Sequence, residues 1–299
     1  MVNLDENIWR KTDIKGTVTK ILSFEHYVHA EDGKVYLCRL RGKQRRVGEV
    51  YVGDRVEFSI SGRSGNIEKV LPRENCLTRP YVANVDVAFI VISPLPEPDY
   101  LLVDKLIVSC FDRKVRPVIV VNKSDCSKDV SNYVQENYGK HFKVHSVSAL
   151  TGEGTKELIC EIKNKTVCFC GQSAVGKTTL MNTLTGLDKT TGGLSKIKRG
   201  RNTTRHVESY PLFGGFIVDT CGFSLLDIED IKAEELALYY PEFDEGRMEC
   251  KFSTCTHIAE PICGVKDRVK SGEISPDRYE RYKILFDEIK NGRDRNERN

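Results

Sequence analysis

The chain has 299 residues, enough for two or three modules with buried cores, and 30% of these residues are charged. Mean hydropathy is −0.38 and no apolar run reaches the length of a membrane helix, so we expect no segment to cross a bilayer. The N-terminal stretch MVNLDENIWRK has acidic residues and no apolar core, unlike a signal peptide. We therefore expect a cytoplasmic protein whose 11 cysteines are reduced.

Residues 1–72 are predicted to form a small antiparallel β-barrel or sandwich, because short alternating segments (GTVTKIL, KVYLCRL, RVEFSIS, NIEKVL) are separated by turn residues. Residues 1–80 hold 15 Lys and Arg against 11 Asp and Glu, a basic surplus. It is concentrated in the run RLRGKQRR, whose cations are Arg39, Arg41, Lys43, Arg45 and Arg46. Such a barrel often binds RNA, but a solvated charged hairpin is an equally open interpretation of this run.

Residues 73–226 are predicted to form an α/β domain. Nearly continuous apolar strands (VDVAFIVIS, RPVIVVN, KVHSVSA, TVCFCG and GFIVDT) alternate with helix-compatible segments (DYLLVDKLIVSCFDR, VSNYVQENY, TKELICEIK and KTTLMNTLTG). Strands that are apolar along their whole length indicate a mainly parallel sheet covered on both faces.

The segment GQSAVGKT, between a predicted strand and a predicted helix, fits the phosphate-binding pattern G-x-x-x-x-G-K-[ST]. Glycines let backbone N–H groups curl around an anion, and the helix N-terminus adds its positive end. Lys177 is expected to reach the β- and γ-phosphates, and the Thr178 hydroxyl to bind Mg²⁺. The predicted phosphate-binding residues are Gly171, Gln172, Ser173, Ala174, Val175, Gly176, Lys177, Thr178 and Thr179.

The segment DTCG follows the strand GFIVD and supplies a second phosphate element. The Asp219 carboxylate can hold Mg²⁺ through water, and the Gly222 N–H can contact a γ-phosphate. Thr203 and Thr204 lie between this segment and the phosphate loop, as a switch threonine does, and spacing alone leaves open which of them binds Mg²⁺.

The tetrapeptide NKSD predicts the base. The Asp125 carboxylate can accept two hydrogen bonds from guanine, whereas adenine has no such pair of donors, so GTP is preferred to ATP. The Lys123 stem can cover the base and Asn122 can brace the loop. The loop after the strand KVHSV resembles one whose backbone N–H groups bind guanine O6. The predicted base-binding residues are Asn122, Lys123, Ser124, Asp125, Ser148 and Ala149.

These elements run in a cyclically permuted order, because the base-reading tetrapeptide precedes the phosphate loop. A site can still form, since the carboxyl ends of parallel strands meet at one edge of a sheet. The segment after DTCG leads directly into the C-terminal region, so nucleotide state could be transmitted there.

Residues 227–299 are predicted to form a helical metal-binding module. Cys250, Cys255, His257 and Cys263 offer three thiolates and one imidazole, the ligands of a closed tetrahedral Zn²⁺ site, with one structural ion per chain. A reduced loop without metal is the alternative. The last helix is predicted in SPDRYERYKILFDEIK, where Ser275 can cap the helix and Pro276 suits its first position.

The motifs NKSD, GQSAVGKTTLMN, GRNTT, DTCGF and CKFSTCTHIAEPICGV together resemble the bacterial ribosome small-subunit-dependent GTPase A family. The resemblance covers nearly the whole chain. It implies an N-terminal OB-fold, a circularly permuted GTPase domain and a C-terminal zinc module. It also implies a factor that binds the small ribosomal subunit and its rRNA late in maturation, hydrolyses GTP there and leaves with GDP. We expect a monomer.

The sequence departs from this family at two positions, with Asn202 where a histidine is usual and Cys221 where a proline is usual. Asn202 and Lys177 are the candidate catalytic residues, although Asn202 cannot become a cation as a histidine can. Phe223 stands where many GTPases place a glutamine, so we expect slow intrinsic turnover and stimulation by the subunit.

Two other functions fit parts of the sequence. A P-loop NTPase or kinase of other specificity would make NKSD incidental. An RNA-binding adaptor would make the nucleotide site vestigial, and the intact Lys177, Thr178 and Asp219 argue against this reading.

Overall fold

The computed structural model describes residues 10–40, 48–61, 64–78, 80–186, 207–219, 228 and 231–296. The chain divides into two compact units. Their described residues lie within 10–86, 161–168 and 207–219 for the first unit, and within 87–160, 169–186 and 228–296 for the second. Within these described ranges, no helix is both long and apolar enough to cross a membrane.

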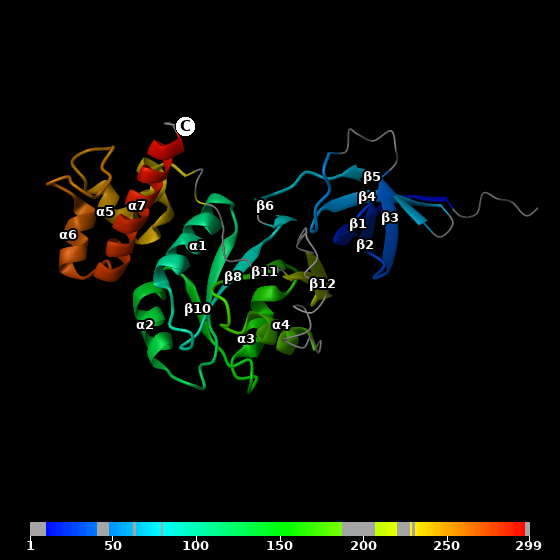
Figure 1. Cartoon of the computed structure of the whole chain (residues 1–299), viewed down its shortest axis with the longest axis horizontal. Coiled ribbons are helices and arrows are strands. Elements are labelled where there is room, and N and C mark those ends of the chain that lie inside the picture. Colours follow the sequence, from blue (N-terminus) through cyan, green and yellow to red (C-terminus); the bar gives the residue numbers. More distant parts are fainter. Residues whose placement is uncertain are drawn as a thin grey trace, which may run out of the picture. The chain divides into compact units, whose positions relative to one another are not determined.

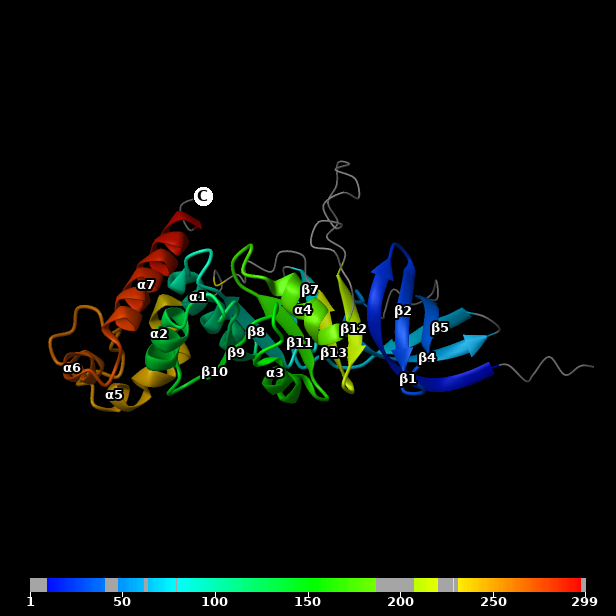
Figure 2. The same cartoon turned by 90° about the horizontal axis from the view of Figure 1, so that it is seen from below.

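The first unit contains a closed barrel of five strands (Figures 1 and 2): β1 (Arg10–Leu22), β2 (Glu25–Ala30), β3 (Val35–Leu40), β4 (Arg55–Ser61) and β5 (Ser64–Val70). The strands pair in the order β1, β2, β3, β5, β4, and β4 closes the ring on β1. Alternate residues point inward, so Val18, Val28, Phe58 and Ile67 are buried in one core. The predicted OB-type barrel is confirmed.

A hairpin extends this barrel within the same unit. Its strands are β12 (Glu208–Leu212) and β13 (Gly215–Asp219), and β13 runs parallel to β11 (Thr166–Cys170). The hairpin meets the barrel where Glu208 pairs with Lys20, and their side chains form an ion pair of 3.2 Å. A separate two-stranded sheet is formed by β6 (Cys76–Thr78) and β7 (Tyr81–Ala83).

The second unit contains three parallel strands, β8 (Val87–Ile92), β9 (Arg116–Val121) and β10 (Lys143–Ser146). Every residue of β8 is buried, as the continuous apolar run predicts for a strand covered on both faces. The helices of the α/β region are α1 (Tyr100–Asp112), α2 (Asp129–Tyr138), α3 (Thr155–Ile162) and α4 (Lys177–Thr185). The predicted α/β class, with a mainly parallel arrangement, is confirmed.

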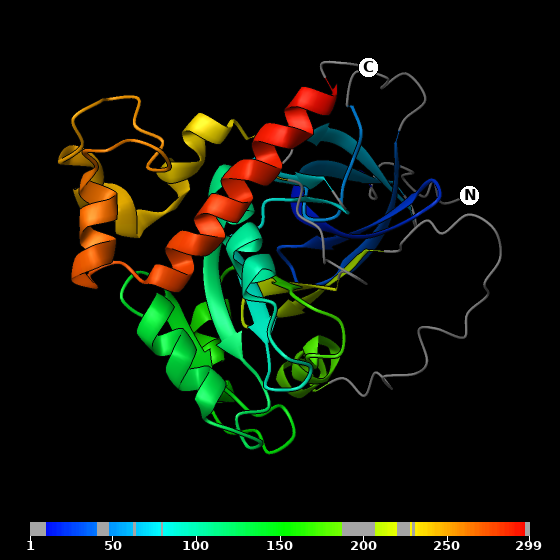
Figure 3. The same cartoon turned by 60° about the vertical axis from the view of Figure 1, so that its left-hand side comes forward.

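The C-terminal part of this unit is helical: η1 (Ala233–Tyr239), η2 (Pro241–Phe243), α5 (Asp244–Met248), α6 (Gly264–Ser271) and α7 (Pro276–Asn296). Phe243, Tyr282 and Leu285 form its core together with Val108 of α1. Helix α7 lies beside α1 (Figure 3) and continues to Asn296, beyond the end predicted near Lys290.

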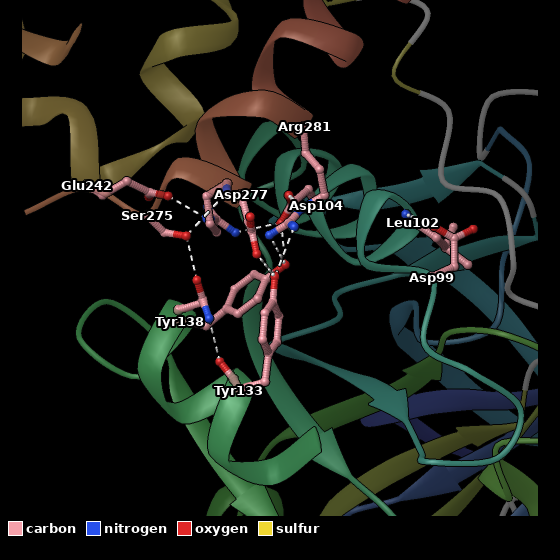
Figure 4. Close-up of polar contacts among 11 residues, drawn as sticks. Asp99, Leu102, Asp104, Tyr133, Tyr138, Glu242, Ser275, Asp277 and Arg281 are labelled. Carbon is pink, nitrogen blue, oxygen red and sulfur yellow. Dashed lines mark hydrogen bonds and ion pairs between the residues drawn. The ribbon is translucent and has the colours of Figure 1, made fainter. Parts of the chain in front are cut away.

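A buried ionic cluster joins α7 to α1 (Figure 4). The Asp104 carboxylate of α1 is completely buried and accepts hydrogen bonds from Arg278 Nη1 at 2.6 Å, Arg281 Nε at 2.5 Å and the Tyr138 hydroxyl at 2.9 Å. Arg278 also binds Glu242 at 2.5 Å. Two cations therefore face two anions, and three helices and the η2 segment are fixed relative to one another by this one cluster.

Replacing Asp104 by Asn should destabilise the second unit by about 3–5 kcal/mol, because it leaves a buried excess of positive charge. Lys105→Ala is the matched control: the neighbouring ion pair of Lys105 with Glu288 is partly exposed and is worth less than about 1 kcal/mol. Urea unfolding followed by circular dichroism measures both effects. Equal unfolding midpoints for the two variants would contradict this role of Asp104.

Candidate functional site

The phosphate loop links β11 to α4, the strand–loop–helix context predicted from the sequence. Gly171 has φ +123°, and a Cβ there would lie 2.1 Å from Val91 O. Gly176 has φ +91°, and a Cβ there would lie 2.4 Å from Asn122 Nδ2. Any side chain would therefore collide at both positions, and the loop backbone can pack closely only because both are glycine.

Asn122 joins three loops that are separate in the sequence. Its side chain is 1% exposed. Its Nδ2 donates to Val175 O in the phosphate loop at 2.9 Å, and its Oδ1 accepts from Ala149 N in the following loop at 3.0 Å. The structure thus brings the NKSD segment, the Ser148–Ala149 loop and the phosphate loop together, as the permuted order requires.

Lys123 makes a second connection between these loops. Its backbone has φ +58°, and its Nζ donates to Ala174 O at 2.9 Å and to Leu95 O. A hydrogen bond from the Ser148 side chain lowers the pKa of Asp125, which keeps the exposed carboxylate ionised and able to accept hydrogen bonds. This is the state that a carboxylate reading guanine requires.

The N–H groups of Ser148 and Ala149 both donate to acceptors within the protein. Ser148 N donates to Glu153 O at 3.0 Å, while Ala149 N donates to Asn122. Thr183 of α4 adds a hydrogen bond from its hydroxyl to Ala149 O at 2.9 Å. The contact of this loop with guanine O6 stays a prediction.

Lys177 lies at the first position of α4, and its Nζ donates to Gly171 O at 2.8 Å and to Gln172 O. Burial lowers the pKa of Lys177, so an anion at this position would stabilise the charged ammonium. Thr178 and Thr179 follow it in the first turn of α4.

Gln172 fastens the phosphate loop to the start of α1, a role that sequence reasoning missed. Its Oε1 accepts from Asp99 N at 3.0 Å and its Nε2 donates to Glu97 O at 3.1 Å. Asp99 is itself the N-cap of α1. The motif pattern allows any residue at position 172, so the pattern could not single out this glutamine.

Of the predicted Mg²⁺ and switch residues, Asp219 is described at the end of β13. The neighbouring Val218 lies beside Cys168 of β11, and β11 continues through Cys170 into the phosphate loop. Several predicted residues lie outside the described residues: Asn202, Thr203, Thr204, Gly222, Arg41, Lys43, Arg45 and Arg46. Arg39 is described and forms an exposed ion pair of 2.9 Å with Glu25.

Cys250, Cys255, His257 and Cys263 converge in the C-terminal module, with their ligand atoms all within 4.8 Å of one another. His257 Nδ1 lies 3.5 Å from Cys250 Sγ and 3.3 Å from Cys263 Sγ, and the two sulfurs are 3.9 Å apart. A tetrahedral Zn²⁺ ion would place its ligands about 3.5–3.8 Å apart. The cluster therefore fits one metal ion of this kind.

The chemistry of the cluster also favours a metal. Burial lowers the pKa of His257 to about 4, so its imidazole is neutral and able to bind a cation. Burial raises the pKa of the Cys255 thiol to about 12, so a thiolate there requires a nearby positive charge. The backbone around the cluster is held by α7, since the Tyr279 hydroxyl donates to His257 O and the Tyr282 hydroxyl to Thr256 O, both at 2.6 Å.

Comparison with known families decides what this arrangement is. A model of the RsgA GTPase family matches residues 70–229, and a model of the RsgA N-terminal domain matches residues 15–67. The chain belongs to the RsgA GTPase family. RsgA family membership confirms that the chain is a GTPase, as NKSD and the phosphate loop predict.

Relatives in this family match over nearly their whole length. One is the small ribosomal subunit biogenesis GTPase RsgA of Geobacillus sp., 41% identical over 288 residues, which are 92% of this chain and 97% of the relative. The protein of the same name from Thermotoga neapolitana is 42% identical over 283 residues, covering 90% of this chain and 95% of the relative.

Solved structures agree with this RsgA assignment. YjeQ from Thermotoga maritima superposes with a TM-score of 0.81 at 38% identity, covering 94% of this chain and 98% of YjeQ. YloQ, described as a circularly permuted GTPase, superposes with a TM-score of 0.80 at 30% identity, covering 97% of this chain and 98% of YloQ. The permuted order predicted from the motifs is confirmed.

Asn122→Ala should weaken the binding of GTP and GDP alike, by about tenfold or more, because it leaves a buried carbonyl and a buried N–H without partners. Titration calorimetry measures both affinities, and Asn132→Ala, an exposed position on α2, is the control. The hydrogen bonds of Asn122 do not involve a γ-phosphate, so a loss of affinity confined to GTP would contradict this role of Asn122.

Metal analysis of freshly reduced protein should find about one zinc atom per chain, the content of a single four-ligand site. Cys263→Ser should lose the metal, whereas Cys126→Ser and Cys160→Ser, at exposed free cysteines, should retain it. Metal-free wild-type protein, or full metal content in Cys263→Ser, would contradict the site.

Proposed function

We propose that this chain is a GTPase that acts in the maturation of the small ribosomal subunit, binds that subunit and its rRNA, and is stimulated by it. The names of the relatives, which match over nearly their whole length, support this role. The observation that supports the nucleotide chemistry is the pair of hydrogen bonds made by the Asn122 side chain, which join the base-reading and phosphate-binding loops. If the NKSD segment were incidental, a buried hydrogen bond from its asparagine to the phosphate loop would not be expected.

In this proposal, GTP lies across the loops that Asn122 joins. Asp125 selects guanine, Lys123 covers the base, and the 171–179 backbone surrounds the phosphates. Lys177 transfers its hydrogen bonds from the loop carbonyls to the β- and γ-phosphates. Asn122, Ser124, Ser148 and Ala149 hold the base loops in place around the nucleotide.

Mg²⁺ would be held by the Thr178 hydroxyl, by Asp219 through water and by Thr203 or Thr204. The ion neutralises charge that develops on the phosphate oxygens during transfer. The chain's own contribution is to position the nucleotide, since Asn202 can hydrogen-bond a water molecule but cannot supply a cation. Turnover without the subunit should accordingly be slow.

The three-part division at 1–72, 73–226 and 227–299 assigns each part a task in this proposal. The barrel and its basic run from Arg39 to Arg46 contact rRNA, the permuted domain hydrolyses GTP, and the C-terminal module uses one structural Zn²⁺ to keep its shape. Acting as a monomer, the protein would bind the subunit through its N-terminal and C-terminal parts.

GTP hydrolysis by the full chain should rise at least about tenfold on adding isolated small subunits, and large subunits should leave it unchanged; this is the test of the proposed function. Lys177→Ala should abolish the reaction because its ammonium meets phosphate charge, while Lys156→Ala, exposed on α3, should not. Equal phosphate release with and without small subunits would overturn the proposal.

A further inference from the structure

A cavity of about 530 Å³ lies within the first unit, outside the residues assigned to GTP and metal. It opens between the outer face of the barrel and the β12–β13 hairpin. The hairpin is joined to the barrel near Glu208, through the ion pair with Lys20 and a hydrogen bond from the Ser209 hydroxyl to Thr19 O. The cavity lies toward the other end of the hairpin, at its turn of Phe213 and Gly214.

The barrel side of the cavity is a row of side chains on three neighbouring strands. Thr17 of β1 pairs with His29 of β2 on one side and with Arg55 of β4 on the other. Directly paired residues point to the same face of a sheet, and this face is outward because the adjacent Val18 is in the core. Lys15, two residues before Thr17, extends the row with a second cation.

Gly16 lies between these positions and allows the strands to pack closely. A Cβ on Gly16 would lie 2.6 Å from Val28 Cγ1 and 2.8 Å from His29 O. Gly16 lines the cavity, and the close packing of β1 on β2 leaves no room for a side chain at this position.

The hairpin side of the cavity is aromatic. The Phe216 ring meets the His29 ring edge to face, with centroids 5.6 Å apart and an angle of 85° between the planes. Phe213 at the turn is 44% exposed, with φ +48°. Aromatic rings beside cations are the combination that binds single-stranded nucleic acid, since rings stack on bases and cations attract phosphates.

The charged side chains among the lining residues are Lys15, Arg55 and Glu31. Arg55 forms an ion pair of 2.8 Å with Glu74, and both side chains are at least half exposed, so this pair is weak. Lys15 is exposed and, within the described part of the chain, no ion pair is found for its ammonium. Glu31 lies beside Lys15, since its N–H donates to Lys15 O at 3.3 Å, and its carboxylate can accept a hydrogen bond from a base amino group.

We propose that this cavity binds one unpaired nucleotide of RNA, with the base against the hairpin phenylalanines and a phosphate at Lys15 and Arg55. The volume suits a single nucleotide and is too small for a duplex. The inference rests on the proposed RNA partner and adds a defined site to it. A free mononucleotide offers the same base and phosphate, so the test distinguishes a nucleotide of RNA from a free nucleotide.

The test measures binding of a labelled single-stranded hexanucleotide RNA to the full chain by fluorescence anisotropy, in excess GDP and over a series of salt concentrations. Phe213→Ala should weaken binding about five- to tenfold without altering the salt dependence, because it removes stacking alone. Lys15→Ala should lower the slope of log affinity against log salt by about 0.7, because it removes one phosphate contact.

Two controls match these variants. Phe252→Ala replaces a phenylalanine of similar exposure, 47%, in the second unit, and Lys34→Ala replaces an exposed lysine of the same barrel outside the cavity. Both should bind RNA as the wild type does. Cross-linking with 4-thiouridine in the RNA should label peptides that contain Phe213 or Phe216.

Unchanged affinity in both Phe213→Ala and Lys15→Ala would overturn the proposal, as would cross-links confined to other peptides. Displacement of the RNA by micromolar AMP or UMP would assign the cavity to a free nucleotide and overturn the RNA assignment. Subunit-stimulated GTP hydrolysis is measured on the same preparations. If the subunit stimulates hydrolysis but both variants bind RNA as the wild type does, only the cavity proposal is refuted. If the subunit does not stimulate the wild type, the proposed function is refuted.

Discussion

Asp104 is the carboxylate on which the arrangement of the second unit depends. It is buried, and its two oxygens accept from Arg278, Arg281 and Tyr138. A buried ion pair adds little net stability compared with apolar packing, but breaking it is costly, so it enforces one arrangement of its helices. The arginines stack on rings as well, with the Arg278 guanidinium 4.5 Å from the Tyr138 ring centroid. Sliding α7 along α1 would separate the buried charges of Asp104 and Arg278.

Helix α1 is therefore held at two points. Near its start, Asp99 caps the helix through Leu102 N and its own N–H is bound by Gln172 of the phosphate loop. Within the helix, Asp104 holds α7, whose Tyr279 and Tyr282 hold the backbone of the metal cluster. The phosphate loop and the cysteine–histidine cluster are thus connected through the contacts of α1 and α7.

The sequence predicted those parts of the fold that short-range patterns encode. Continuous apolar runs located β8 and β9, a motif of fixed spacing located the phosphate loop, and close sequence proximity singled out the four cysteine and histidine residues that cluster in the structure. Strand β2 was not predicted, because its sequence EHYVHA contains too few apolar residues to indicate a strand. In the structure its alternate residues His26, Val28 and Ala30 are buried. A pattern on one helix also cannot reveal that Asp104 is buried, since Arg278 lies far away in the chain.

The order of elements gives a short route from the nucleotide to the proposed RNA cavity. The segment with Thr203 and Thr204 is followed directly in the chain by β12, whose first residue, Glu208, pairs with Lys20 of the barrel. Strand β12 therefore both lines the cavity and pairs with β1. If Thr203 or Thr204 binds Mg²⁺ in the proposed GTP state, a shift of that segment would reach β12 through covalent bonds alone. By linkage, RNA bound in the cavity would then favour one nucleotide state over the other, with no need for a long chain of side-chain contacts between the two sites.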